Sequence, residues 1–491
     1  MKVATLAIGV WGYPPGWKTA TYRLEGRSIT SRVTLDAIVN AFNPDRVLVL
    51  IPDTVATNAM VGSAATYHDL VQSIVGWLYN WIQGNTVALR QYRELRVEVA
   101  PNLGTYSQCS WTAPGCPAFQ LYAFHAMRAI LENLADLSVE ADEVRVLLDT
   151  SHGINYMPLA ASEALTAVAA SIAASTNTSI EIRVYNSEPY PSGVQHTPVL
   201  EVHEVEARRV EPRSAAVEAA LDLLKTAYSR GGSVSVKLAA TERRQAGMLG
   251  RMLNAPAREL VERDGVPSAV ASILGLPLAA AYLAVDSRLD IDVATELINE
   301  AVNVFREYTV VGASPCRVEH LVCLSYDGAR VLLEAAALAR RVKSAVCTVL
   351  EKCPPSLEEL EDRGVYLDEL SEISARLAPL TNFFVHSELY GIQRMVSEHA
   401  GCRCEADGKP PVCNNCGALR VPLYCGDWPG AACNPSRVNY RNFLAHGGVE
   451  YNAVEATIDS SGLALRYREG CWSHIRDKLL PNAAREIAGV R

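Results

Sequence analysis

Positive charge is scarce in this sequence. It contains 45 lysines and arginines against 54 aspartates and glutamates, which gives a formal net charge of −9. Such a protein has no overall electric field that attracts nucleic acid. If the chain handles a nucleic acid, it must do so through a local basic pocket, because binding to phosphates depends on nearby positive side chains.

Signals for secretion or membrane insertion are also scarce. Residues 1–10 contain only a short apolar run, without the long apolar stretch and small-residue cleavage site of a signal peptide. A longer uncharged run, 265–285, contains Pro267, Gly275 and Pro277, and no second such run accompanies it. Because proline interrupts helices, we expect a buried helical hairpin kinked at Pro277 rather than a membrane span. The sequence predicts a soluble, cytoplasmic protein.

The dinucleotide fingerprint G-x-G-x-x-G is absent after the first predicted strand, although the surrounding pattern suits it. Apolar strand-like runs alternate with helix-like segments up to about residue 190, and the runs lie at 3–10, 47–51, 95–99, 144–148 and 180–185. This alternation predicts a Rossmann-like α/β domain with a mainly parallel sheet. Without the fingerprint, a dinucleotide cofactor is not expected.

The composition changes near residue 212, which we take as the end of the α/β domain. The run 199–210 before it is expected to be an edge strand or the connection out of the domain. Beyond it Ala, Leu, Glu and Arg dominate and strand-like runs are rare. We expect a small helical linker unit at 213–290 and an all-α domain at 291–491.

The all-α region contains Arg441 and His446, separated by four residues. In an ideal helix this step gives about 7.5 Å of rise and side chains about 140° apart, so the two do not share one face. They converge only if the helix bends or starts between them, which Gly447 and Gly448 permit, or if a second copy contributes its own pair.

The chemistry of this pair suits metal-independent RNA cleavage, in which the 2′-hydroxyl attacks the adjacent phosphate. His446 would be the general acid or base, Arg441 would stabilise the phosphate, and Asn442 would assist by orientation. The alternative is an arginine and a histidine on an ordinary helix surface.

Two loops at the ends of predicted strands carry groups suited to ligand binding. Ligands of α/β sheets bind at the carboxyl ends of parallel strands, and amides at a following helix start can hold phosphate. The candidate ligand-binding residues are Trp11, Gly12, Trp17 and Thr19 after the first strand, and Thr150, Ser151, His152, Gly153, Asn155 and Tyr156 after the fourth. The alternatives are a hydrophobic lid or dimer contact for the first loop and an ordinary strand-to-helix turn for the second.

Together these motifs resemble the CRISPR-associated ribonucleases of type III systems. Those proteins join a CARF domain (CRISPR-associated Rossmann fold) to a HEPN ribonuclease domain in this order. The resemblance rests on Asp-Thr-Ser-His-Gly-Ile-Asn-Tyr-Met-Pro at 149–158, on Arg-Asn-Phe-Leu-Ala-His at 441–446, and more weakly on Trp-Lys-Thr-Ala-Thr-Tyr at 17–22.

The resemblance implies a ligand-activated enzyme with two modules. A cyclic oligoadenylate, in this branch cyclic tetra-adenylate, would bind the CARF domain and switch on cleavage of single-stranded RNA by the HEPN domain. No cofactor would be required for catalysis. Both sites would form across a homodimer or a higher even oligomer, where each loop appears twice.

Six of the 13 cysteines gather in one stretch, which we interpret as an insertion at 401–435 in the HEPN-like domain. Cys402, Cys404, Cys413 and Cys416 have spacings that suit a structural zinc ion. Disulfides or free thiols are the alternatives. Cys425 and Cys433 are expected to extend or replace these ligands.

Two other functions remain open at this stage. One is a non-catalytic CARF-type transcription regulator that binds DNA through 213–290. The acidic net charge and the Arg441–His446 pair argue against it. The other is a metal-dependent nuclease that uses the cysteines. The sequence has no obvious carboxylate-rich metal site, which argues against this function. His386 and His399 are interpreted as helix-surface or packing residues.

Overall fold

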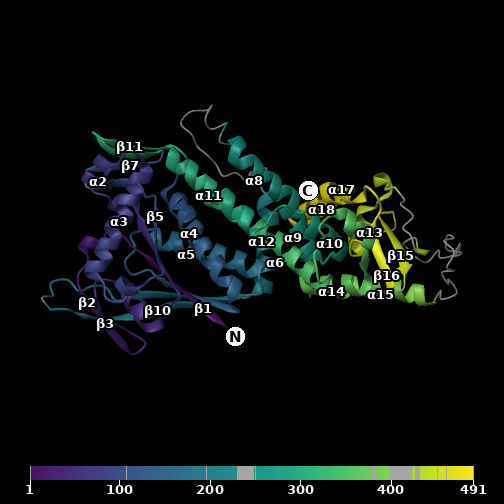
Figure 1. Ribbon diagram of the computed structural model, residues 1–491, viewed down its shortest axis with the longest axis horizontal. Coiled ribbons are helices and arrows are strands. Elements are labelled where there is room, and N and C mark those ends of the chain that lie inside the picture. Colours follow the sequence, from purple (N-terminus) through teal and green to yellow (C-terminus); the bar gives the residue numbers. More distant parts are fainter. Residues whose placement is uncertain are drawn as a thin grey trace. The chain divides into compact units, whose positions relative to one another are not determined.

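The computed structural model describes residues 2–106, 108–194, 196–228, 248, 250–378, 382–398, 423–425, 432–450, 452–459 and 462–489 (Figure 1). The contacts divide the chain into two compact units. The N-terminal unit is built mainly from Met1–Ala215 and Ala294–Leu333, and the C-terminal unit mainly from Glu259–Val293 and Glu334–Arg491. The chain therefore forms two units rather than three consecutive parts.

An eight-stranded sheet organises the N-terminal unit, in the order β3-β2-β10-β9-β8-β1-β4-β5. Five consecutive strands, from β9 to β5 at one edge of the sheet, pair in parallel with their neighbours in this set, as the alternating pattern predicts. These strands are β1 (Val3–Val10), β4 (Arg46–Pro52), β5 (Leu95–Ala100), β8 (Glu143–Asp149) and β9 (Ser179–Ser187). β4 is an almost continuous apolar run that is buried between helices, whereas β5 and β9 alternate apolar with charged residues.

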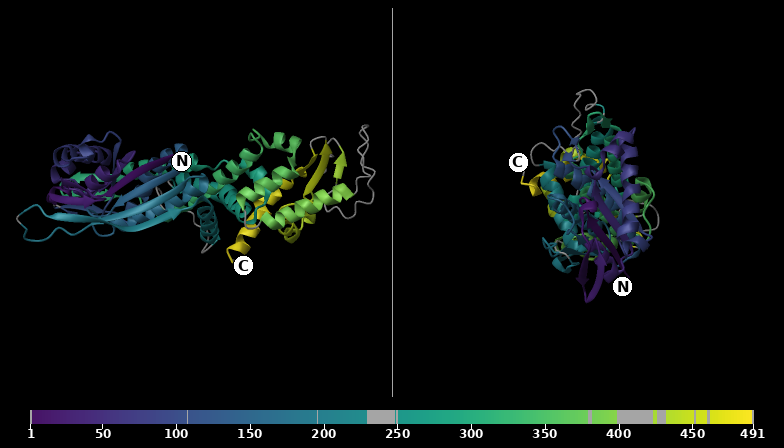
Figure 2. Two further views of the ribbon diagram at one scale, coloured as in Figure 1. Left: turned by 90° about the horizontal axis from the view of Figure 1, so that it is seen from below. Right: turned by 90° about the vertical axis from the view of Figure 1, so that its left-hand side faces the viewer.

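Three further strands extend the sheet beyond β9. β10 (Val199–Val210) runs antiparallel to β9, and Figure 2 shows these two as long neighbouring strands. The hairpin β2 (Ala20–Leu24) and β3 (Arg27–Ser31) completes this side. β2 pairs with β10 only at Val199, Leu200 and Glu201, so the remainder of β10 pairs on one side with β9 and forms an edge, as the interpretation of 199–210 expected. The strand is followed by α6 (Pro212–Tyr228), along which the chain leaves the N-terminal unit.

Helices pack against this sheet. They are α1 (Thr34–Phe42), α3 (Tyr67–Asn85), α4 (Ala118–Glu140) and α5 (Met157–Ser175). By length and composition α5 could cross a membrane, but 61% of its apolar window is buried inside the protein. It packs against α4, β1 and β9, so it serves as a core helix of this unit.

A second, four-stranded sheet joins two distant parts of the N-terminal unit. Its order is β11-β12-β7-β6, with β6 (Gly104–Tyr106), β7 (Cys109–Thr112), β11 (Thr309–Ala313) and β12 (Cys316–His320). Disulfides Cys109–Cys316 and Cys116–Cys323 cross-link the two parts. The segment 294–333 thus packs with the α/β domain, although its helix-rich composition placed it in the C-terminal domain.

Two long helices flank β11 and β12 in the sequence, α11 (Ile291–Glu307) before them and α12 (Tyr326–Val349) after them. The first turn of α12 is anchored to the α/β domain by Tyr326. Its backbone N–H donates to Gln120 Oε1 at 3.0 Å, and its hydroxyl donates to the Glu163 carbonyl at 3.1 Å. Gln120 and Glu163 lie on α4 and α5, so the start of α12 is held by the helices that cover the large sheet.

The C-terminal unit is mostly helical. Its helices include α9 (Val266–Leu274), α10 (Pro277–Asp286), α14 (Leu367–Leu377), α15 (Asn382–Glu398), α16 (Tyr440–Ala445) and α18 (Leu480–Ile487). Gly275 ends α9 in the left-handed conformation, with φ of 63°, and Pro277 starts α10. Both helices are buried, which confirms the helical hairpin predicted for 265–285.

The C-terminal unit also carries a small sheet, so the expectation of an all-α domain is wrong. The strand order is β13-β16-β15-β14, with β13 (Val365–Tyr366), β14 (Leu423–Cys425), β15 (Val454–Asp459) and β16 (Gly462–Tyr467). β15 and β16 form an antiparallel pair, visible as yellow arrows in Figure 1. β13 and β14 are only two and three residues long, too short to show a strand pattern. β15 and β16 are six-residue strands close together in the sequence, which the helix-rich composition of the region led us to miss.

Candidate functional site

A cavity of about 560 Å³ lies at the carboxyl ends of the central strands of the large sheet. Three segments supply most of its lining, namely the loop after β1, the loop after β8, and the end of β9 with the residues that follow, and β2 and β10 add one residue each. Its lining residues are Gly16, Trp17, Lys18, Tyr22, Ser151, His152, Gly153, Ile154, Asn186, Ser187, Glu188, Pro189, Tyr190 and Leu200. The two loops singled out in the sequence therefore meet at one cavity.

The loop after β8 is shaped by hydrogen bonds to its own strand and to β9. The Ser151 N–H donates to Asp149 Oδ1 at 3.0 Å, and the Thr150 hydroxyl donates to the Tyr185 carbonyl at 3.0 Å. Gly153 has no room for a side chain, since an added Cβ would lie 2.3 Å from Pro158 Cγ. Glycine is required here because the helix start packs directly on the loop.

The loop after β1 is built on tryptophans. Trp11 is completely buried, and Trp17 packs edge-on against both Trp11 and Trp81 at ring distances of 5.4 and 5.8 Å. The Trp17 ring also lies 4.3 Å from the His152 ring. This cluster joins the first loop to the second and holds one wall of the cavity.

Four of the predicted ligand-binding residues line the cavity and six do not. Trp17, Ser151, His152 and Gly153 form part of its wall. Trp11, Gly12, Thr19, Thr150, Asn155 and Tyr156 are outside the lining set.

Three of these six residues shape the two loops without lining the cavity. The Gly12 N–H donates to the His152 carbonyl at 2.8 Å. Tyr156 donates its hydroxyl to Asn102 Oδ1 at 2.5 Å, and the Asn102 N–H donates to the buried carboxylate of Asp53. Asn155 adopts the left-handed conformation with φ of 53°.

Sequence reasoning missed the third wall, formed by 186–190. The Asn186 amide donates to the Thr150 hydroxyl at 3.0 Å, and the Ser187 N–H donates to the Ser151 hydroxyl at 2.9 Å. The Lys18 ammonium lies 5.3 Å from the centre of the Tyr190 ring. These residues lie at the end of β9 and directly after it, and β9 is the parallel neighbour of β8, so the rule that ligands bind at parallel strand ends could have found them.

Burial shifts the pKa of two groups at this strand end in opposite directions. The Asp149 carboxyl is almost completely buried, which raises its pKa to about 6. Burial also lowers the pKa of His152 to about 4, so its imidazole is neutral at neutral pH. A neutral His152 ring next to Trp17 presents an aromatic and hydrogen-bonding surface without a charge.

The second candidate site lies in the C-terminal unit, at the helix α16. Asn439 caps this helix by accepting a hydrogen bond from the Asn442 N–H at 3.0 Å, and Phe443 anchors it in the core. His446 directly follows the last residue of the helix, and Gly447 and Gly448 continue with φ of 62° and 87°. The helix therefore ends at the histidine, as the two glycines permit.

Exposure differs among the three predicted catalytic residues. Arg441 and Asn442 are exposed, whereas the His446 side chain is 18% exposed. His446 Nδ1 lies 2.9 Å from Glu388 Oε2 on α15. Sequence reasoning missed Glu388 because a carboxylate 58 residues earlier shows no spacing that links it to the histidine.

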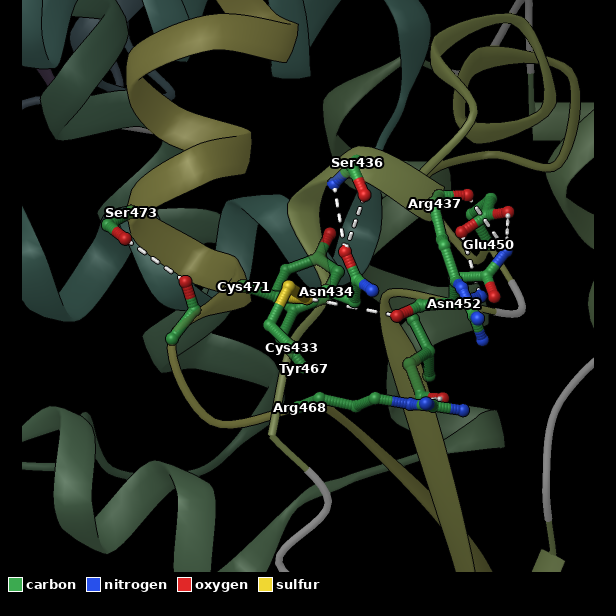
Figure 3. Close-up of a disulfide and its surroundings, with 12 residues drawn as sticks. Cys433, Asn434, Ser436, Arg437, Glu450, Asn452, Tyr467, Arg468, Cys471 and Ser473 are labelled. Atoms are coloured by element: carbon green, nitrogen blue, oxygen red, sulfur yellow. Dashed lines mark hydrogen bonds between the residues drawn. A yellow bond between two sulfur atoms is a disulfide. The ribbon is translucent and has the colours of Figure 1, made fainter.

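A disulfide fixes the segment that leads into α16 (Figure 3). Cys433 is bonded to Cys471, and the Cys433 N–H donates to the Glu469 carbonyl at 2.9 Å. Downstream, the Asn452 amide donates to the Arg437 carbonyl at 3.0 Å, four residues before Arg441. The expectation that Cys433 extends or replaces zinc ligands is wrong, because its sulfur is bonded to Cys471.

The four cysteines with zinc-like spacing, Cys402, Cys404, Cys413 and Cys416, lie outside the described residues, as does His399. Within the described part of the chain, no group of three or more His, Cys, Asp or Glu side chains is placed to hold a metal ion. His386 is exposed and shares a 2.9 Å hydrogen bond with Ser371, in agreement with its interpretation as a helix-surface residue.

Comparison with known proteins identifies the unit that holds the cavity. Residues 6–189 match the family described as "CRISPR system endoribonuclease Csx1, CARF domain". The N-terminal part of this chain is a CARF domain. This match confirms the predicted relation to CARF-containing, CRISPR-associated ribonucleases and covers all three walls of the cavity up to Pro189.

A curated relative extends the comparison. The chain is 27% identical over 210 residues to the CRISPR system endoribonuclease Csx1 of Methanocaldococcus jannaschii. The match covers 42% of this chain and 41% of the relative. The match therefore spans less than half the length of the relative.

Proposed function

We propose that this protein is an endoribonuclease of CRISPR antiviral defence that is switched on by a cyclic oligoadenylate. The relation of the CARF domain to a protein named as an endoribonuclease carries this proposal. It is supported by the place of Arg441 and His446 in a separate, mostly helical unit, where an exposed arginine precedes a histidine at a helix end.

The cleavage step uses groups of the chain itself. The 2′-hydroxyl oxygen of the RNA attacks the neighbouring phosphorus, and the bond from phosphorus to the 5′ oxygen breaks. His446 takes or gives a proton, the Arg441 guanidinium binds the phosphate oxygens, and Asn442 helps to orient the RNA. The products carry a 2′,3′-cyclic phosphate and a 5′-hydroxyl, and the scheme needs no metal ion.

The chemistry of the cavity suits an adenylate ligand. Trp17 and Tyr190 offer aromatic rings for a base, Lys18 offers a positive charge for a phosphate, and Ser151 and Asn186 offer neutral polar groups. A volume of about 560 Å³ suits a small molecule but holds only part of a ring of four nucleotides. Two copies in a homodimer would bind the whole of cyclic tetra-adenylate symmetrically.

The test is cleavage of a fluorescent single-stranded RNA by the purified protein, with a panel of cyclic oligoadenylates and with EDTA throughout. We expect cleavage with cyclic tetra-adenylate and little or none without it. Absence of cleavage with every ring, combined with a mobility shift of duplex DNA, would instead support the non-catalytic CARF-type transcription regulator.

A further inference from the structure

Glu388 and His446 form a partly buried pair in the C-terminal unit. Glu388 Oε2 lies 2.9 Å from His446 Nδ1, and the side chains are 39% and 18% exposed. They come from different helices, since Glu388 lies within α15 and His446 ends α16. The distance and the partial burial of the imidazole indicate a directed hydrogen bond rather than a diffuse attraction between surface charges.

Packing of the two backbones holds this pair in place. The His446 N–H donates to the Asn442 carbonyl at 3.0 Å, which fixes the histidine at the end of α16. Gly447 then lies against Val385, because a Cβ added there would be 3.1 Å from Val385 Cγ2. Val385 precedes Glu388 by about one helical turn, so the same stretch of α15 contacts the glycine turn and supplies the carboxylate.

We propose that Glu388 is a positioning residue that holds His446 in one tautomer, with a proton on Nδ1 and with Nε2 as the nitrogen that reacts. This inference rests on the proposed ribonuclease function. An ionised carboxylate only accepts hydrogen bonds, so the imidazole nitrogen facing it must carry the hydrogen. The neutral ring then has its lone pair on Nε2, and the same contact fixes the plane of the ring.

Both possible roles of the histidine pass through Nε2. As a base, Nε2 takes the proton of the 2′-hydroxyl while the new oxygen–phosphorus bond forms. As an acid, the Nε2–H gives its proton to the departing 5′ oxygen as that bond breaks. In each case the positively charged form of the ring is stabilised by the carboxylate on Nδ1, which neither gains nor loses a proton.

If the pair only stabilised the fold, removal of Glu388 would lower thermal stability rather than slow the chemical step. Exposed pairs contribute little to stability, and a carboxylate that is 39% exposed belongs near that class. Removal of Glu388 should therefore leave the unfolding temperature almost unchanged. The effect of a positioning residue appears instead in the chemical step, where it lowers kcat and leaves the KM for RNA intact.

The experiment compares Glu388→Gln and Glu388→Met with the wild type at saturating cyclic tetra-adenylate. Glutamine keeps an acceptor oxygen for Nδ1–H, whereas methionine has a similar length and offers only a weakly accepting sulfur in its place. We expect kcat to fall about 10-fold for Gln and about 100-fold for Met, with the KM for RNA changed less than about 2-fold. Glu372→Gln is the matched control, since Glu372 is exposed and pairs only with Arg376 in its own helix among the contacts described.

His446→Ala is measured in parallel, so that a failure of the positioning role can be distinguished from a failure of the ribonuclease proposal. Wild-type kcat in Glu388→Met beside an inactive His446→Ala would overturn the role of Glu388 and leave the ribonuclease proposal intact. Full activity of His446→Ala would overturn the ribonuclease assignment itself. Equal losses for Gln and Met, or a loss accompanied by lower thermal stability and higher KM, would also overturn the positioning role.

Discussion

The indole of Trp17 lies 4.3 Å from the imidazole of His152, measured between ring centres, with 58° between the ring planes. This contact joins the loop after β1 to the loop after β8 on the wall of the CARF cavity. An aromatic pair of this kind adds a modest attraction beyond burial of its surface. Its removal should therefore affect the cavity more than the fold.

The first prediction concerns activation. Trp17→Ala or His152→Ala should raise the concentration of cyclic tetra-adenylate that gives half-maximal RNA cleavage by about tenfold, which corresponds to about 1.4 kcal/mol of lost binding free energy. The measurement is an activator titration with RNA in excess. Cleavage at saturating activator should largely recover, because neither residue lies in the unit that holds Arg441 and His446.

Asn155 provides a control within the same loop. It has φ of 53° and does not line the cavity, so Asn155→Gly should leave the titration midpoint unchanged. Asn155→Ala should instead lower stability by about 1 kcal/mol, because alanine adopts this conformation less readily. Unchanged midpoints for Trp17→Ala and His152→Ala, in folded protein, would show that this cavity is not the activator site.

The second prediction concerns pH. Between its ordinary pKa of 3.8 and its folded pKa of about 6, Asp149 binds more protons in the folded state, so its contribution to stability falls as pH rises. His152 has an ordinary pKa of 6.5 and a folded pKa of about 4, so its contribution rises with pH. The two effects oppose each other across nearly the same pH window.

Asp149→Asn should separate these effects. The variant should be more stable than the wild type at pH 7, by up to about 3 kcal/mol, and the difference should vanish near pH 3.5. Thermal unfolding of both proteins from pH 3.5 to 7.5 measures this. A variant less stable than the wild type at pH 7 would mean that the ionised carboxylate stabilises the fold through a partner.

The third prediction concerns catalysis. His446→Ala should abolish RNA cleavage, and Arg441→Ala should reduce it by about 100-fold or more, because each removes a group that acts on the reacting phosphate. Binding of cyclic tetra-adenylate, measured by calorimetry, should stay unchanged. His386→Ala is the control, since His386 is an exposed histidine on α15 that shares a hydrogen bond with Ser371. Comparable activity in the His446→Ala and His386→Ala proteins would refute the assignment.

The fourth prediction concerns the disulfides that cross-link the second sheet. Cys109–Cys316 and Cys116–Cys323 each span 207 residues and close nearly the same loop. In the chain-entropy description the first bridge contributes about 5 kcal/mol, and the second, closing a ring of roughly 16 residues, about 3 kcal/mol. Replacing one pair by alanine should therefore cost about 3 kcal/mol, and replacing both about 8 kcal/mol.

Denaturant unfolding of the single-pair, double-pair and wild-type proteins measures these costs. The combined loss should exceed the sum of the separate losses, because either bridge alone removes most of the entropy of the long loop. Wild-type protein kept in strong reductant should resemble the double-pair variant. Strictly additive losses would count against this account.

The fifth prediction concerns the cysteines at 402–416. We expect about one zinc ion per chain, bound by the thiolates of Cys402, Cys404, Cys413 and Cys416. Elemental analysis of the purified protein measures the metal, and Cys413→Ser should remove it. Four disulfides, Cys109–Cys316, Cys116–Cys323, Cys347–Cys353 and Cys433–Cys471, are formed by the described residues. Protein without metal whose mass rises on reduction by more than these four bonds explain would indicate disulfides among the cysteines at 402–416 instead.

The sequence by itself determined the central sheet and the two loops that meet at the cavity. β1 and β4 are almost continuous apolar runs, and β5, β8 and β9 carry an apolar residue at least at every second position, as packing of a parallel sheet between helices requires. The loops at Trp11–Thr19 and Thr150–Tyr156 follow from where two of these runs end. These features are local, because a strand and its end are encoded by neighbouring residues.

Only the tertiary structure decided which distant segments meet. The third wall of the cavity, the four-stranded sheet held by Cys109–Cys316 and Cys116–Cys323, and the contact of Glu388 with His446 all join residues far apart in the chain. No periodicity of 2 or 3.6 residues encodes such a pairing. It arises when helices and sheets bury their apolar faces against each other, and that packing brings a carboxylate on α15 to the end of α16.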